Sequence, residues 1–141
     1  MHLRTRGPVL FGLFVSLIAA LGCGTAATSP LSPNPSGGTP HFAQDIQPIF
    51  NAACAGCHSG SHPAESLPLN SGSAYANIVN IPATEEGSTM LVTPGDPARS
   101  YLYQKITESA RFGDEMPPEG GLSSREVAAI RAWIQNGALN D

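Results

Sequence analysis

The hydrophobic and polar positions divide the chain into three parts. A mostly apolar run from Val9 to Leu21 follows two arginines near the start. Residues 24–40 are small, polar and rich in proline, so they offer almost nothing to bury. Beyond them, apolar residues recur at helical spacing, and no stretch alternates convincingly as a strand does. The pattern predicts a removed leader at residues 1–22, a tether at 23–40 and one folded domain at 41–141.

Two helices are expected in the first half of the folded domain. The first covers residues 45–53, where Asp45 caps the start and Pro48 stands in the first turn. The second is shorter and covers residues 73–79. Residues 81–94 are expected to form an extended loop.

Two further helices are expected in the second half. One starts at Asp96, with Pro97 at its first helical position. The last helix has the clearest boundaries, because Ser123 and Glu126 form a capping box and Gly137 ends it. The segment between these helices is rich in glycine and proline, which excludes a helix or a central strand. The sequence therefore predicts an all-α domain with long loops.

A Cys-x-x-Cys-His motif, formed by Cys54, Cys57 and His58, directly follows the first expected helix. Two thiols at this spacing can form thioethers to the two vinyl groups of one haem, and the histidine then lies under the iron. In an exported chain the motif predicts one covalently attached haem c. A zinc site would need a second ligand pair, and a thioredoxin-like site would need a βαβ pattern around the motif; the sequence offers neither.

Met116 is the leading candidate for the second axial ligand of the iron. It lies on a loop that two following prolines stiffen, and a stiff loop holds a weak thioether with little loss of chain entropy. Met90 is the rival thioether, but its apolar neighbours favour packing in the core. His62 is expected to be an ordinary histidine, and His41 is ordinary or an alternative ligand.

Apolar side chains around the porphyrin should exclude water, or else form ordinary helix-packing core. The five expected in one of these roles are Phe50, Tyr101, Leu102, Ile130 and Trp133. Three acids, Asp114, Glu115 and Glu119, flank Met116. They form a solvated rim or steer a basic redox partner.

Taken together, these motifs resemble one known family, the bacterial single-haem class I cytochrome c domains. The resemblance covers residues 42–138. It rests on the haem motif, the segment Phe-Ala-Gln-Asp-Ile-Gln-Pro-Ile-Phe before it, the Met-Pro-Pro loop and the Trp-Ile pair of the last helix. It implies a small helical fold around one haem, His58 and Met116 as axial ligands, and one-electron transfer.

Cys23 stands in the sequence Ala-Leu-Gly-Cys-Gly, which resembles the box at which bacterial lipoproteins are cleaved and lipidated. Gly24 after the cysteine resembles the pattern for sorting to the outer membrane. The expected location is the periplasmic side of the outer membrane, with a lipid anchor on Cys23. Cleavage near residues 25–27 is the alternative, and it would release a soluble periplasmic protein.

Charge bears on the partners. Without the leader, five basic residues remain against eleven acids, a net charge of −6. Such a surface repels nucleic acid; it favours a basic partner, or it merely keeps the protein soluble.

Three functions remain open at this point. The first is a one-electron carrier in an extracytoplasmic redox chain, or an accessory subunit of an oxidoreductase, with a redox protein as partner. The second is an enzyme or small-ligand sensor with an open iron site, peroxidase-like or gas-binding. The third is a structural lipoprotein without haem. The Met-Pro-Pro loop favours the carrier, which is not itself an enzyme.

Overall fold

The structure is a computed structural model that describes residues 38–141. The expected leader, Cys23 and most of the expected tether lie outside the described residues. The described part contains four α-helices, one π-helix and two 3-10 helices, joined by long loops and isolated bridges rather than strands. The predicted all-α fold is therefore confirmed. Within this part of the chain, no helix has the length and apolar character needed to cross a membrane.

The chain enters the fold through two consecutive helices, η1 (Phe42–Ile46) and α1 (Gln47–Ala53). Pro48 lies in the first turn of α1, as predicted. The prediction that Asp45 caps this helix was wrong, because helical backbone already begins at Phe42. Asp45 instead lies inside η1, and its carboxylate accepts a hydrogen bond of 2.8 Å from the amide of His41. It thus supports the first turn from within.

The third predicted helix is divided in two. Asp96 caps the short helix η3 (Pro97–Arg99), accepting a hydrogen bond of 3.1 Å from the amide of Arg99. The extended backbone of Ser100 then interrupts the helical path before α3 (Tyr101–Lys105). The two remaining short helices are η2 (Ala64–Ser66) and α2 (Ala74–Ile78), and α2 lies within the predicted range.

The last helix, α4 (Ser124–Gln135), begins as the sequence predicts. The amide of Glu126 donates to the Ser123 hydroxyl at 3.3 Å, and the amide of Ser123 donates to the Glu126 carboxylate at 2.8 Å. This capping box satisfies two backbone donors that the helix itself leaves unpaired. Gly137 follows the helix with a φ of +98°, the left-handed conformation that favours glycine at a helix end.

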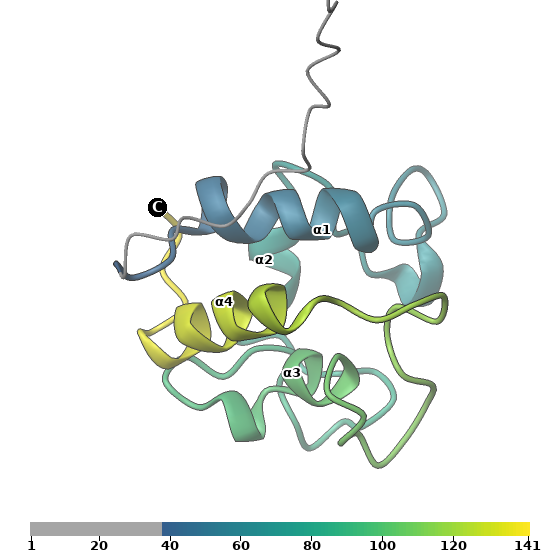
Figure 1. The fold of residues 1–141 in the computed structure, drawn as a ribbon. Coiled ribbons are helices and arrows are strands. Elements are labelled where there is room, and N and C mark those ends of the chain that lie inside the picture. Colours follow the sequence, from purple (N-terminus) through teal and green to yellow (C-terminus); the bar gives the residue numbers. More distant parts are fainter. Residues whose placement is uncertain (1–37) are drawn as a thin grey trace, which may run out of the picture.

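Aromatic rings join the helices into one core. The ring of Phe42 in η1 lies 5.2 Å from that of Tyr75 and 5.3 Å from that of Trp133, between centroids. The indole of Trp133 also donates to the carbonyl of Leu139 at 2.9 Å. These contacts tie η1, α2 and α4 together, and α3 lies on the other side of α4 from α1 (Figure 1).

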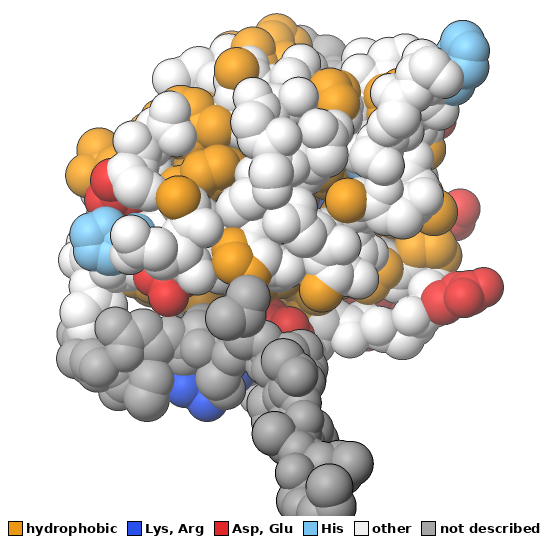
Figure 2. Space-filling model, turned by 90° about the horizontal axis from the view of Figure 1, so that it is seen from above, with side chains coloured by type: hydrophobic (Ala, Val, Ile, Leu, Met, Phe, Trp, Pro, Cys, Tyr) orange, Lys and Arg blue, Asp and Glu red, His pale blue; other side chains and the backbone are white. Residues whose placement is uncertain are grey.

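Two long loops lie on the same side of the helices. One follows α1, and the other, residues 106–123, connects α3 to α4 (Figure 1). On the face seen from above, hydrophobic side chains are scattered among backbone and side chains of other kinds (Figure 2). The cavity described next lies where the two loops meet.

Candidate functional site

A cavity of about 320 Å³ lies between the loop that follows α1 and the loop that precedes α4. Apolar atoms form most of its wall. The residues that line it include all four haem-binding candidates in the described part of the chain: Cys54, Cys57, His58 and Met116. Residues far apart in the sequence thus converge on one space.

The Cys-x-x-Cys-His segment forms a tight turn at the end of α1. Cys54 is the last residue that the helix holds, and its carbonyl accepts hydrogen bonds from the amides of Cys57 at 3.2 Å and His58 at 2.9 Å. Both thiols are unpaired; Cys54 is half-buried and Cys57 is exposed. Burial raises the pKa of the Cys54 thiol to about 11. The motif therefore places one thiol in the cavity wall and the other at its mouth.

The imidazole of His58 is oriented by a backbone carbonyl six residues further along the chain. Its Nδ1 lies 3.1 Å from the carbonyl oxygen of Ala64. A carbonyl only accepts, so the shared proton resides on Nδ1, and the lone pair of Nε2 is left for a metal. The backbone is fixed as well, since the carbonyl of His58 accepts from the amide of Leu69 at 2.7 Å.

Met116 is half-buried, and it lines the cavity together with the two prolines that follow it. Its amide donates to the carbonyl of Lys105 at 2.9 Å, which attaches the loop to the end of α3. Met90 does not line the cavity, and 38% of its surface is exposed, so the prediction that it packs in the core was wrong. Its backbone bridges both Pro82 and Ser100, and this pairing leaves the side chain near the surface.

The remaining predicted residues divide between the cavity and other places. Tyr101 and Leu102 line the cavity. Phe50, Ile130 and Trp133 are buried in the core outside it, which matches the alternative of ordinary packing. His41 and His62 are exposed and do not line the cavity; Nδ1 of His41 lies 2.8 Å from the carboxylate of Asp141.

A polar cluster that the sequence did not suggest borders the same cavity. The ammonium group of Lys105 lies 3.1 Å from the carboxylate of Glu85, and this hydrogen bond lowers the pKa of Glu85. The hydroxyl of Tyr101 lies 2.9 Å from the same carboxylate and 2.7 Å from the carbonyl of Phe112. Burial raises the pKa of Tyr101 to about 12, so the hydroxyl stays a neutral donor.

The cavity and its donors fit a haem. A volume of about 320 Å³ with a mostly apolar wall falls in the range of cofactor pockets. Two thiols could form thioethers to the vinyl groups of one haem, and an imidazole with Nε2 available and a thioether are side chains that haem iron takes as ligands. A zinc site would need several charged or thiol ligands together, and residues 38–141 contain no cluster of three or more His, Cys, Asp or Glu.

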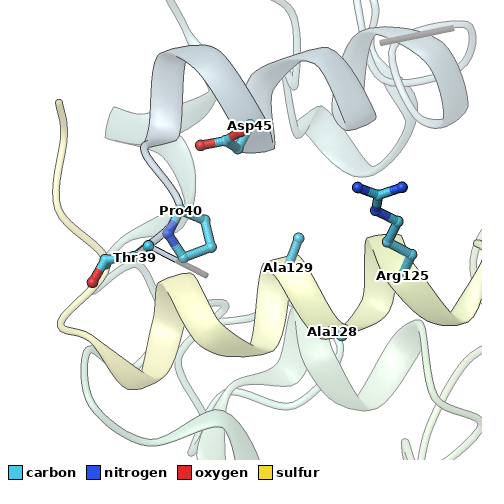
Figure 3. Close-up of a pocket in the computed structure, with 7 residues that line it drawn as sticks. Thr39, Pro40, Asp45, Arg125, Ala128 and Ala129 are labelled. Carbon is cyan, nitrogen blue, oxygen red and sulfur yellow. The ribbon is translucent and has the colours of Figure 1, made fainter. Parts of the chain in front are cut away.

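A second cavity, of about 200 Å³, lies between the start of the described chain and α4. Asp45 and Arg125 stand at its edges, and Ala128 and Ala129 form its floor (Figure 3). It contains none of the predicted thiol, imidazole or thioether donors. The chemistry that the sequence predicts therefore belongs to the larger cavity.

Comparison with known proteins gives one match. The family model described as "Cytochrome C oxidase, cbb3-type, subunit III" matches residues 41–134. The matched range contains both loops of the larger cavity and nearly all of the folded part. No curated protein and no solved structure gives a significant match.

Proposed function

The chain belongs to the family of cbb3-type cytochrome c oxidase subunit III, and on this premise we propose that it carries one haem c, attached through Cys54 and Cys57. The chain forms an all-α, cytochrome c-like domain, and cytochrome c domains carry out haem-based electron transfer. We propose further that His58 and Met116 are the axial ligands, and that the protein is a one-electron carrier rather than an enzyme.

One observation carries the proposal. The cavity between the two loops is lined by two thiols, an imidazole and a thioether, which come from segments far apart in the sequence. Met90 and the two other described histidines do not line it. This selective convergence favours a closed, six-coordinate iron over the open-site alternative.

The protein's own residues set the conditions for electron transfer. Haem iron supplies the one-electron couple when it is bound. The hydrogen bond from His58 to Ala64 orients the imidazole and keeps Nε2 available as a metal ligand. Met116 would hold the iron through its thioether, and a thioether ligand would favour the ferrous state and raise the reduction potential. Cys57 is exposed, and we propose that a redox partner approaches the haem from this side of the cavity.

The test is the absorption spectrum of the haem-loaded protein, purified from a host that attaches c-type haem. We expect a low-spin spectrum in both oxidation states and a ferric sulfur-to-iron charge-transfer band. The Met116→Ala variant should lose that band, whereas Met90→Ala should keep it. A high-spin spectrum of the wild type, or rapid binding of added small ligands, would instead support the open-site enzyme or sensor.

We also propose that the protein works in an extracytoplasmic redox chain with a redox protein as partner. The excess of acids over bases supports a basic docking surface on that partner. Reduction or oxidation by membrane fractions should then slow as salt is added. A protein that exchanges electrons with no membrane fraction would contradict this role.

The proposed attachment to the membrane depends on Cys23, in the lipoprotein-like box of the sequence. We propose a lipid anchor at this residue and a location on the periplasmic side of the outer membrane. Labelling with a radioactive fatty acid should mark the wild type and not Cys23→Ser. Release of an unlabelled wild-type protein into the soluble periplasmic fraction would support the alternative cleavage site.

A further inference from the structure

The loop that carries Met116 has little structure of its own. Residues 106–123 form neither helix nor strand, and most side chains between 111 and 121 are exposed. A loop of this kind keeps one conformation only if contacts with the rest of the fold hold it. The position of Met116 in the cavity therefore depends on where the loop is attached.

The first residues of this loop, 106–109, bond to the end of α3, and two further hydrogen bonds attach its exposed part, residues 111–121. The Tyr101 hydroxyl lies 2.7 Å from the carbonyl of Phe112, and the amide of Met116 lies 2.9 Å from the carbonyl of Lys105. Both attachment points are in the same short helix, one at its first residue and one at its last. They hold the loop on either side of Gly113, which packs against the Lys105 and Glu85 side chains.

The attachment surface is itself well fixed. Only 3% of Tyr101 and 7% of Lys105 is exposed. The Lys105 ammonium lies 5.6 Å from the centre of the Tyr101 ring and 3.1 Å from the Glu85 carboxylate. The single hydroxyl proton of Tyr101 is shared between the carbonyl of Phe112 and the Glu85 carboxylate, which lies 2.9 Å from the hydroxyl, so one carboxylate orients both side chains.

We infer that Glu85, Tyr101 and Lys105 form a latch that holds the Met116 loop, and that Tyr101 is a positioning residue for the sixth ligand. The inference deepens the proposed function, since it rests on Met116 as an iron ligand. The latch acts without touching the iron. It lowers the population of an open loop, in which the thioether has left the cavity, and so sets how often the iron is accessible to another ligand.

Removal of one hydroxyl tests the latch. In the haem-loaded protein, Tyr101→Phe removes the hydroxyl that contacts both the carbonyl of Phe112 and the carboxylate of Glu85, and it leaves the ring in place. A typical hydrogen bond corresponds to a roughly 3- to 10-fold change in the open population. We therefore expect amide hydrogen exchange at Met116 and cyanide binding to the ferric protein to accelerate by that factor. Exchange in α4, at Ile130, should not change.

Tyr75→Phe is the matched control. It removes a hydroxyl that donates to the carbonyl of Ala138 at 2.9 Å, on the aromatic core and outside the cavity lining. This variant should leave cyanide binding and exchange at Met116 at wild-type rates. If Tyr101→Phe behaves like Tyr75→Phe, or accelerates exchange at Ile130 as much as at Met116, the latch is overturned.

Failure of the ligation proposal gives a different result. A wild type without the sulfur-to-iron band would show that Met116 is not a ligand, and the role of Tyr101 toward a sixth ligand would fall with it. Exchange at Met116 would still report on the loop: acceleration in Tyr101→Phe supports its attachment through Tyr101, and an unchanged rate refutes it. The band tests the ligand, and the exchange tests the latch.

Discussion

Gly113 lies so close to Lys105 that a β-carbon at residue 113 would stand 2.5 Å from the ammonium nitrogen. The same added carbon would lie 2.6 Å from a carboxylate oxygen of Glu85. Either the ends of these two side chains or the loop itself must shift to admit that carbon. Glycine at residue 113 therefore allows the Met116 loop to pack closely against Lys105 and Glu85.

Gly113→Ala should weaken the attachment of the loop. Its φ of +66° strains any residue with a β-carbon, and the contact with Lys105 adds to that strain. Gly72→Ala is the control, because Gly72 has a φ of +82° but nothing lies within 4 Å of an added β-carbon. In urea unfolding, we expect Gly113→Ala to lose about 1 kcal/mol more than Gly72→Ala, and to bind cyanide faster. Equal losses and equal binding rates in the two variants would contradict the close seating.

Glu85→Gln should remove a pH-dependent part of the stability. The folded pKa of Glu85 is lowered, so its carboxylate stabilises the fold fully above the unfolded pKa of about 4.3. This stabilisation is lost as the pH falls through the folded pKa. At neutral pH we expect Glu85→Gln to be less stable by about 1 kcal/mol, a modest value because a third of the Glu85 side chain is exposed.

Urea unfolding from pH 7 down to pH 3 checks this prediction. The gap between wild type and Glu85→Gln should be constant near neutral pH and should close as the solution becomes acidic. Glu108→Gln, at an exposed carboxylate after α3, is the control for a change of charge alone. A gap that widens on acidification would show that Glu85 does not stabilise the fold in its ionised form.

Ser123→Ala should destabilise α4 through its first turn. The variant removes the acceptor for the Glu126 amide and one partner of the Glu126 carboxylate. Loss of such a cap typically costs about 1 kcal/mol in the free energy of unfolding. Ser124→Ala, one residue later, replaces a serine inside the helix and should change the free energy by a few tenths of a kcal/mol at most. Similar values for the two variants would show that the capping box contributes nothing.

The sequence predicted those features that local chemistry determines. The capping box of Ser123 and Glu126 and the cap at Asp96 each involve residues three apart, so their spacing is visible in the sequence. The Cys-x-x-Cys-His motif is equally local. The family match supports the all-α cytochrome c-like fold that these signals predicted.

Features that depend on tertiary contacts were not predictable in the same way. Glu85 meets Lys105 across twenty residues, and an isolated glutamate in a loop gives no indication of its partner. Met90 has apolar neighbours in the sequence, yet backbone bridges on both sides leave it near the surface. The early start of η1 depends on packing of Phe42 against the rings of other helices.

His58 and His62 should differ sharply in their effect on the haem spectrum. His58 lines the cavity with Nε2 available, whereas His62 is exposed and lies outside the lining. We expect His58→Ala to convert the ferric protein from low spin to high spin, and His62→Ala to keep the wild-type spectrum. Added imidazole should restore a low-spin spectrum to His58→Ala by filling the vacated position. If only His62→Ala lost the low-spin spectrum, the iron ligand would be His62 and not His58.

The two cysteines should contribute separately to haem attachment. If each thiol forms one thioether, Cys54→Ser and Cys57→Ser should each retain haem through the other cysteine, with one vinyl group left free. A free vinyl group stays conjugated with the ring, so the absorption bands of both single variants should shift to longer wavelength. The double variant should release all of its haem on extraction with acidified acetone, whereas the wild type should release none.

Because Cys54 is half-buried in the cavity wall and Cys57 is exposed, Cys57→Ser should perturb the fold less than Cys54→Ser. Haem that stays bound to the double variant through extraction would show that attachment does not depend on these thiols.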